Sequence, residues 1–173
     1  MKGTIIVCLR ELVVTQFGEH QWDKSLQDAD FSPDAMFLAI ADIDDSHVVR
    51  LLEAVCKNVG VTPAQAADAF GDYWVNVYSQ RLYPHYYRRH ATARDFLLNM
   101  DQVHVDMTAQ ITNAKPPRFQ YEWKDAQTLI IQYRSHRGLV DFVVGLVKGV
   151  GKHYKEALQV SKLGPDRVQV VFA

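Results

Sequence analysis

The hydrophobic pattern of this chain changes its period at two adjacent prolines, Pro116 and Pro117. Before them, apolar residues recur every three or four positions, which is the spacing of helices with one buried face. After them, residues 119–123 and 127–134 have the composition of two strands joined by a polar turn. Neither proline continues a helix, because each lacks the N–H that the helical ladder needs. The sequence therefore predicts an α+β fold, with a mainly helical first part and a small antiparallel sheet behind it.

Several segments before the prolines have helical spacing. Apolar positions favour helices over residues 3–17 and 45–59, and a glycine follows each segment as a stop signal. A short helix is expected near residues 21–26, and Ser32–Pro33 indicates a turn or a helix start.

Capping residues mark two further helices. Thr62 and Gln65 form a capping box, with Pro63 in the first turn. Thr92 offers a second start, and the helix that follows it is expected to carry His104 and to end at the prolines.

Beyond the first strands, residues 139–153 favour another helix, and residues 158–162 and 167–172 favour a final hairpin. The 173 residues thus predict a single domain. We expect a helical subdomain over about residues 1–62, packed on a second subdomain over about residues 63–173 that holds the sheet.

Composition excludes several classes of partner. The formal net charge is -1, so no overall field favours nucleic acid or an anionic membrane. Cys8 and Cys56 lie far apart in no metal-binding or redox motif. No apolar run reaches membrane-spanning length, and no secretory pattern opens the chain. We therefore expect a cytoplasmic protein with no membrane or nucleic-acid partner.

His104 is the first candidate for chemistry. It shares a helical face with Phe96, Met100, Met107 and Ile111. An imidazole on an apolar face is either a hydrogen-bonded core residue or a ligand, and its position alone favours the core residue. A single histidine is, however, a common way to hold haem iron and leave the opposite side open.

Residues 133–137, Tyr-Arg-Ser-His-Arg, offer a second half for such a site. On a strand, alternate side chains share one face, so Tyr133, Ser135 and Arg137 would point together. Two hydroxyls and a guanidinium suit carboxylates, such as the propionates of a flat apolar ring. The alternative is a strand end with solvent-facing polar side chains. Together with His104, these three clamp residues favour a ligand site.

These motifs give the chain a family resemblance. The sequence resembles the haem-nitric oxide/oxygen binding (H-NOX) family, whose relatives form the haem domain of soluble guanylate cyclase. The resemblance covers essentially the whole chain, and its most specific marks are residues 100–104 (Met-Asp-Gln-Val-His) and 133–137. Residues 69–71 (Ala-Phe-Gly) are a weaker mark. The resemblance implies haem b between the two subdomains and a sensor, not an enzyme; the sequence holds no phosphate loop, HExxH or nucleophile elbow.

The resemblance also assigns roles to residues. His104 would be the proximal iron ligand, and the clamp residues would bind the propionates. Pro117, or Pro116 in its place, would press on the haem, and Ile5 would pack on the ring. Gly71 would face the proximal side. From the residues alone, a glycine inside a helix indicates either the approach of something bulky or a helix–helix contact.

The side of the haem opposite the proximal ligand decides which gas is bound. Oxygen-binding members of the family place a tyrosine on the helix after the clamp, and the matching residue here is Phe142. A phenyl ring donates no hydrogen bond, so the resemblance implies nitric oxide and carbon monoxide as ligands. Trp74 and Tyr78 are also expected to reach the pocket, with Leu9 and Leu146. A polar tip pointing at the iron would weaken this conclusion.

The resemblance also implies how gas binding would be signalled. Nitric oxide bound opposite His104 would weaken or break the iron–histidine bond. Relief of strain at Ile5 and Pro117 would then let the haem flatten. The resemblance implies a partner in trans, either a histidine kinase or an enzyme of cyclic di-GMP turnover. The alternatives left open are an oxygen-binding haem sensor or carrier and a haem-free interaction module. A peroxidase would need a distal acid–base pair, and the expected pocket is too apolar for one.

Overall fold

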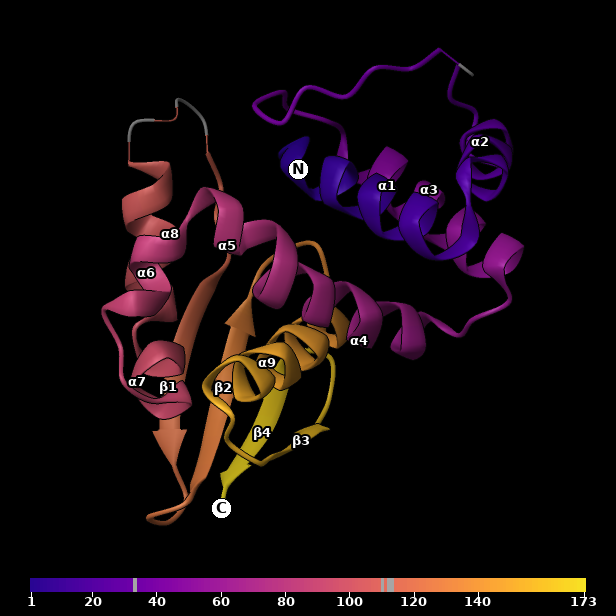
Figure 1. Cartoon of the computed structure of the whole chain (residues 1–173). Helices are drawn as coiled ribbons and strands as arrows, with labels where there is room; N and C mark the ends of the chain where they lie inside the picture. The colour runs from indigo at the N-terminus through magenta and orange to yellow at the C-terminus, as the bar shows by residue number, and fades with distance from the viewer. Residues whose placement is uncertain (33, 110, 112–113) are drawn as a thin grey trace. The chain divides into compact units, whose positions relative to one another are not determined.

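The computed structural model describes residues 1–32, 34–109, 111 and 114–173 (Figure 1). Contacts divide the chain into two compact units, residues 1–66 and 67–173. The turn expected at Ser32–Pro33 lies partly outside the described residues, which do not include Pro33. Within the described part of the chain, no helix combines the length and the apolar character needed to cross a membrane.

The first unit contains α1 (Thr4–Phe17), α2 (Glu19–Asp28) and α3 (Asp45–Val59). The helices expected over 3–17 and 45–59 are confirmed, and α2 extends the short helix expected near 21–26. Gly18 and Gly60 follow α1 and α3 with φ of 85° and 72°, which side chains disfavour. The three helices share a core of apolar residues at helical spacing: Ile6, Leu9, Leu12, Val13, Trp22, Leu26, Val48, Leu51 and Leu52.

Helix α4 starts at the end of the first unit and continues into the second. The elements from there to the C-terminus are α4 (Pro63–Tyr73), the π-helix η1 (Trp74–Tyr78), α5 (Ser79–Leu82), α6 (Pro84–Arg88), α7 (Ala93–Leu98), α8 (Met100–Thr108), β1 (Arg118–Trp123), β2 (Thr128–Arg134), α9 (Val140–Tyr154), β3 (Leu158–Lys162) and β4 (Arg167–Phe172).

The capping box at the start of α4 is confirmed, because the Gln65 N–H donates to the Thr62 hydroxyl at 3.2 Å and the Thr62 N–H donates to Gln65 Oε1 at 2.9 Å. The helix then widens into η1, which the apolar spacing did not predict. The Ser79 hydroxyl donates to the Trp74 carbonyl, five residues earlier, at 2.7 Å. This bond satisfies a carbonyl in the wider turn.

The single helix expected from Thr92 to the prolines is wrong. Its start is confirmed, because the Asp95 N–H donates to the Thr92 hydroxyl at 3.0 Å. At Asn99 the chain turns, with φ of -95° and ψ of 0°, and its N–H bonds to carbonyls of the preceding turn. The result is two short helices, α7 and α8, and α8 ends well before Pro116.

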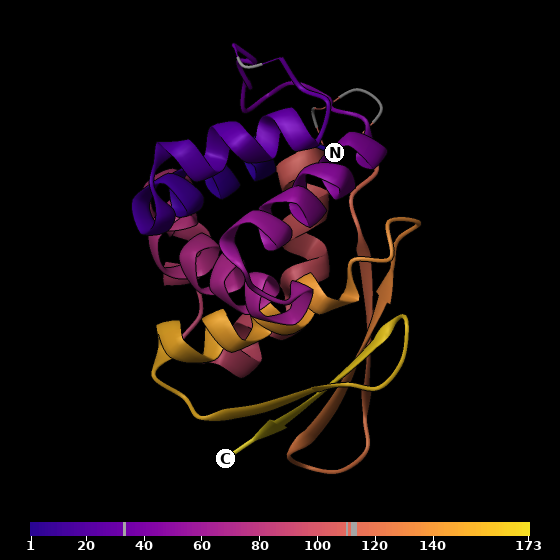
Figure 2. The ribbon, with the colours of Figure 1, turned by 90° about the vertical axis from the view of Figure 1, so that its right-hand side faces the viewer.

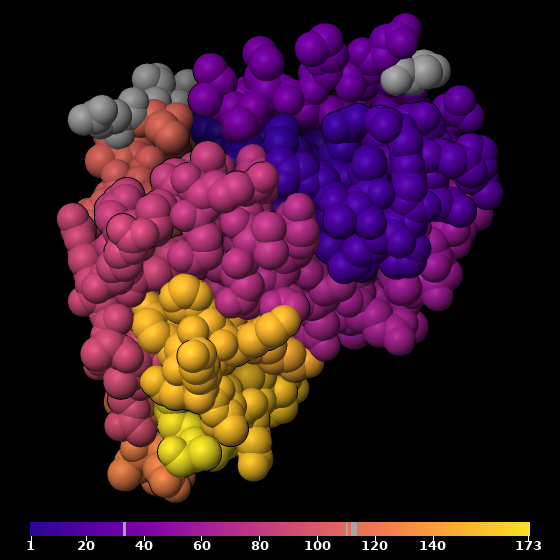
Figure 3. All heavy atoms as spheres, in the orientation of Figure 1, coloured from indigo at the N-terminus to yellow at the C-terminus, as the bar shows by residue number. Residues whose placement is uncertain are grey.

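The four strands form one antiparallel sheet in the order β1-β2-β4-β3. Both expected hairpins are therefore present, and the predicted α+β class is confirmed. Figure 2 shows α9 lying across one face of this sheet. Their shared core is apolar: Leu129, Ile131, Val140, Val143, Val147, Val150, Val168, Val170 and Phe172. In the space-filling view, the gold surface of α9 lies directly against the pink surface of the preceding helices (Figure 3).

Candidate functional site

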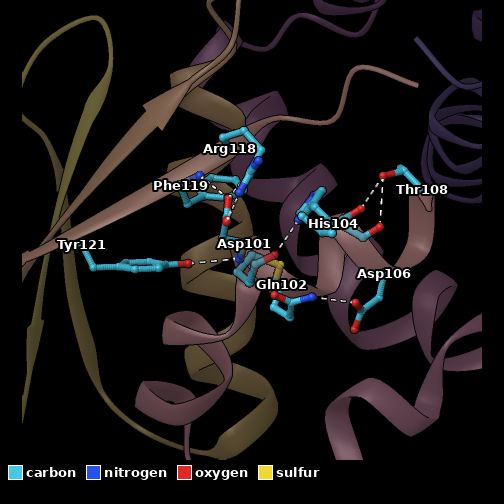
Figure 4. Close-up of polar contacts among 10 residues, drawn as sticks. Asp101, Gln102, His104, Asp106, Thr108, Arg118, Phe119 and Tyr121 are labelled. Carbon is cyan, nitrogen blue, oxygen red and sulfur yellow. Dashed lines mark hydrogen bonds and ion pairs between the residues drawn. The ribbon is translucent and has the colours of Figure 1, made fainter. Parts of the chain in front are cut away.

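His104 lies on α8, one helical turn after Met100 (Figure 4). Its Nδ1 is 2.9 Å from the Met100 carbonyl oxygen. Since a carbonyl only accepts, the proton of the neutral imidazole lies on Nδ1, and Nε2 keeps its lone pair. The ring is half-buried and packs against Phe119, with 5.3 Å between the ring centroids. Burial lowers the pKa of His104, so its imidazole is neutral at pH 7 and able to bind a metal through Nε2.

Asp101 fastens the first turn of α8 to β1 (Figure 4). Arg118 donates through Nε and Nη2 to the two carboxylate oxygens, at 2.8 and 2.7 Å. The Phe119 N–H donates to the same carboxylate at 2.8 Å. These contacts, the Arg118 hydrogen bond first among them, lower the pKa of Asp101 to about 2. A charged carboxylate therefore ties the helix of His104 to the strand that follows the prolines.

The clamp residues lie at the end of β2, but the strand does not carry all three. It ends at Arg134, so Tyr133 belongs to the strand while Ser135 and Arg137 lie beyond it. The Arg137 N–H donates to the Ser135 hydroxyl at 3.3 Å, which forms a tight turn. The expected alternation is kept nonetheless: Tyr133 is buried, Ser135 and Arg137 are half-buried, and Arg134 and His136 are exposed. The expectation that one strand carries all three residues is therefore wrong, because Ser135 and Arg137 lie in the turn after β2.

Arg137 joins this turn to the proline segment. Its Nη1 donates to the Lys115 carbonyl oxygen at 2.9 Å, and the adjacent Pro116 and Pro117 are both half-buried. The Nε of the same guanidinium is buried and makes no hydrogen bond within the described residues. A guanidinium held in this way fits an additional carboxylate partner, such as a haem propionate.

Four aromatic residues form a row in the second unit. Trp74 stacks on Tyr78 and on Phe70, with centroid distances of 5.4 and 5.9 Å, and Phe142 meets Phe70 edge-on at 5.3 Å. Tyr78 is buried, whereas Trp74, Phe142 and the neighbouring Leu146 are half-buried. The row joins α4, η1 and α9, and it brings together the second-unit residues expected on the distal side. Phe70 was not expected there, although its spacing of four from Trp74 was a signal.

Gly71 lies where α4 and α9 approach each other. A methyl group on its Cα would lie 2.1 Å from the carbonyl carbon of Gly145 on α9. A methyl group on Gly149 would likewise lie 2.6 Å from the Gly71 carbonyl oxygen. The glycines let the backbones of α4 and α9 nearly touch. The close contact supports the helix–helix explanation for this glycine. Its expected place facing the proximal side of a haem stays a prediction.

Ile5 and Leu9 lie on α1, in the first unit. Ile5 is half-buried and Leu9 is 3% exposed. Their expected packing on a haem stays a prediction.

Sequence reasoning missed three residues that hold α8. Asp101 is an acid shortly before His104, and Arg118 is a base directly after the prolines. Their opposite charges were a signal for an ion pair. Tyr121, whose hydroxyl oxygen is 3.2 Å from the Asp101 backbone nitrogen, offered no signal of this kind.

The fold and this donor set define a haem-binding gas-sensor domain. A half-buried arginine beside two hydroxyl residues, and a neutral histidine whose Nε2 keeps its lone pair, fit such a group. Residues 2–162 match the family described as Haem-NO-binding, and the chain belongs to this family. The H-NOX resemblance drawn from the motifs is thereby confirmed.

Curated relatives and solved structures agree with this assignment. Soluble guanylate cyclases gcy-32 and gcy-34 of Caenorhabditis elegans are each 26% identical over 156 residues, 88% of this chain. The chain spans 23% of the length of these relatives. A Cs H-NOX mutant with 4-cyano-L-phenylalanine at site 5 is 26% identical, with a TM-score of 0.85 over 99% of this chain and 96% of that one. An oxygen-binding H-NOX domain related to soluble guanylate cyclases, in its oxygen complex, is 26% identical, with a TM-score of 0.82 over 99% and 95%.

Proposed function

We propose that this chain is a haem-based nitric oxide sensor in which His104 is the proximal ligand of haem b. The observation that carries the proposal is the 2.9 Å contact between His104 Nδ1 and the Met100 carbonyl oxygen. It fixes the tautomer and the ring orientation, as the partners of metal-binding histidines do, and presents Nε2 to a metal. The chain's membership of a haem-binding family supports the choice of cofactor.

The clamp residues would hold the propionates. Tyr133 and Ser135 offer hydroxyls and Arg137 a guanidinium, which are groups that bind carboxylates. The Lys115 carbonyl oxygen orients Arg137 by accepting a hydrogen bond from its Nη1. Pro117, with Pro116 as the alternative, would press on the ring from the segment between α8 and β1.

We also propose that the helical subdomain of about residues 1–62 and the subdomain of about residues 63–173 each supply haem contacts. Ile5 and Leu9 would contribute from α1, and Trp74, Tyr78 and Leu146 from the second unit.

Phe142 favours nitric oxide over oxygen as the ligand. Bound oxygen is polar and gains from a hydrogen-bond donor, whereas nitric oxide and carbon monoxide bind ferrous haem without one. Phe142 packs edge-on against Phe70, so two apolar rings occupy this part of the aromatic row.

The signal would leave through α8. His104 would hold ferrous haem through Nε2, and the haem would supply an iron able to bind nitric oxide and to exchange its histidine ligand. If Nε2 were released from the iron, His104 would keep its hydrogen bond to the Met100 carbonyl. Asp101 still ties the first turn of α8 to β1, so the end of the helix near Thr108 gains the most freedom. A partner in trans, a histidine kinase or a cyclic di-GMP enzyme, would respond by binding the two states with different affinity.

An oxygen sensor or carrier is the second candidate. A solved relative in its oxygen complex has the same fold at 26% identity, so the fold agrees with either gas. Trp74 and Tyr78 carry polar tips within the aromatic row, and either tip directed at the ligand would supply the donor that Phe142 lacks.

Absorption spectra of the ferrous protein test the proposal. We expect a Soret band after haem supplementation, a nitric oxide complex that has lost its histidine, and no stable oxygen complex. A nitrosyl complex that keeps six ligands would overturn the release of His104. A stable oxygen complex would favour the second candidate, and a protein that stays colourless with added haem would be an interaction module.

A further inference from the structure

We infer that Tyr121 is a positioning residue that strengthens His104 as an electron donor to bound iron. It acts through the peptide group between Met100 and Asp101. The inference rests on the proposed function, because it concerns how strongly His104 binds iron. Tyr121 lies on β1, and its hydroxyl contacts the backbone of α8 at Asp101.

One peptide group lies between the two side chains. Its carbonyl, that of Met100, is 2.9 Å from His104 Nδ1 and accepts the imidazole proton. Its N–H, that of Asp101, donates to the Tyr121 hydroxyl oxygen at 3.2 Å. Figure 4 shows the phenol and the imidazole approaching the start of α8 from opposite sides. The hydrogen bonds therefore run in series from the imidazole, across the peptide, to the phenol.

The position of Asp101 explains why its N–H needs an outside partner. The first N–H groups of a helix have no acceptor within the helix. Asn99, which precedes α8, makes no capping hydrogen bond with its side chain. The Asp101 carboxylate is committed to Arg118 and to the Phe119 N–H. Tyr121 supplies the acceptor, and its side chain is half-buried against the core of the second unit.

Hydrogen bonds in series polarise one another, more strongly where water is excluded. Donation from the Asp101 N–H to Tyr121 moves electron density toward the Met100 carbonyl oxygen. A more negative carbonyl draws the Nδ1 proton of His104 more strongly, which makes Nε2 a stronger donor. Loss of the phenol oxygen would therefore weaken the iron–histidine bond, raise the haem reduction potential and ease release of the histidine.

Tyr121→Phe tests the inference, with Tyr154→Phe as a matched control. Tyr154 is also half-buried, its hydroxyl donates to the Tyr87 carbonyl at 2.8 Å, and burial raises the pKa of both tyrosines to about 12. In the haem-free protein, the amide proton of Asp101 should shift upfield in Tyr121→Phe alone. In the ferrous haem protein, the iron–histidine stretching frequency should fall in Tyr121→Phe alone. Haem should dissociate from Tyr121→Phe up to about ten-fold more readily than from the wild type. This is the lower end of the effect on metal affinity when the hydrogen-bond partner of a metal ligand is removed.

The outcomes separate the inference from the proposed function. An amide shift without a change in stretching frequency would overturn the inference and leave His104 as the ligand. Equal frequency changes in both variants would also overturn it, because the effect would then be general. A wild-type protein with no iron–histidine band would overturn the proposed function itself. Tyr121→Met repeats the removal of the hydroxyl with a flexible side chain if Tyr121→Phe does not fold.

Discussion

Asp101 and Arg118 form a two-bond ion pair that closes a loop containing both prolines. The pair joins the first turn of α8 to the first residue of β1, with nitrogen–oxygen distances of 2.8 and 2.7 Å. The Asp101 side chain is 23% exposed and the Arg118 side chain 57%. The carboxylate is thus the less exposed partner. The segment with Pro116 and Pro117 is held by this pair after the prolines and by the bond from Arg137 to the Lys115 carbonyl before them.

This pair predicts a loss of stability in acid. The pKa of Asp101 is lowered from 3.8 to about 2, chiefly by the hydrogen bond from Arg118. A carboxyl group whose pKa is lowered by folding contributes stability above its unfolded pKa, and the contribution is lost as pH falls through the folded value. The unfolding free energy of the wild type should therefore fall more steeply than that of Asp101→Asn between pH 3.8 and about 2. Urea unfolding at a series of pH values measures the difference.

Asp141→Asn is the control for this prediction. Asp141 also receives two contacts from one cation, Lys162, at 3.0 and 2.9 Å, and this pair joins α9 to β3. If Asp101→Asn kept the acid dependence of the wild type, the Asp101–Arg118 pair would not be a source of stability.

His104→Gly is expected to abolish normal haem ligation. The glycine leaves a space where the ring packs beside Phe119, and free imidazole should enter it and restore the iron–nitrogen bond. The absorption spectrum with and without imidazole measures this rescue. His136→Gly, at an exposed histidine within residues 133–137, should leave the spectrum unchanged. Normal ligation in His104→Gly without imidazole would show that another residue binds the iron.

Local patterns in the sequence predicted most of the fold. Residues 45–59 have a regular apolar period and a glycine stop, and α3 has those bounds. The two hairpins follow from strand composition and polar turns. The widening of the helix at η1 was not predictable, because it depends on Ser79, whose hydroxyl also contacts the buried hydroxyl of Tyr87 at 2.7 Å. A bond of this kind depends on tertiary packing, which apolar spacing does not reveal.

The residues of the candidate site could be selected from the sequence, but the contacts that hold them in place could not. His104 and the clamp residues stand in motifs, so residue type and order were enough to select them. The pairing of Asp101 with Arg118 crosses the proline segment, and the Tyr121 contact depends on how β1 packs on α8. For Gly71 the sequence left two explanations open, because a glycine indicates a close approach without identifying the group that approaches.

Phe142→Tyr is expected to raise oxygen affinity if residue 142 faces the ligand. A new hydrogen bond contributes about 1 kcal/mol, which corresponds to about a five-fold gain in affinity. Oxygen titration of the ferrous protein measures the gain. Phe17→Tyr, at a side chain that is 42% exposed, adds the same hydroxyl elsewhere and should have no effect. An unchanged oxygen affinity in Phe142→Tyr would remove residue 142 from the distal side.

Gly71→Ala is expected to destabilise the fold without changing the ligation of His104. The added methyl group would lie 2.1 Å from the Gly145 carbonyl carbon, so α4 and α9 must separate. Overpacking of this kind costs about 1–3 kcal/mol, which urea unfolding at neutral pH would measure. Gly149→Ala should act in the same direction, since its methyl group would lie 2.6 Å from the Gly71 carbonyl oxygen. Unchanged stability together with a shifted iron–histidine frequency would return Gly71 to the proximal side. Lost stability with an unchanged frequency would establish it as the contact between α4 and α9.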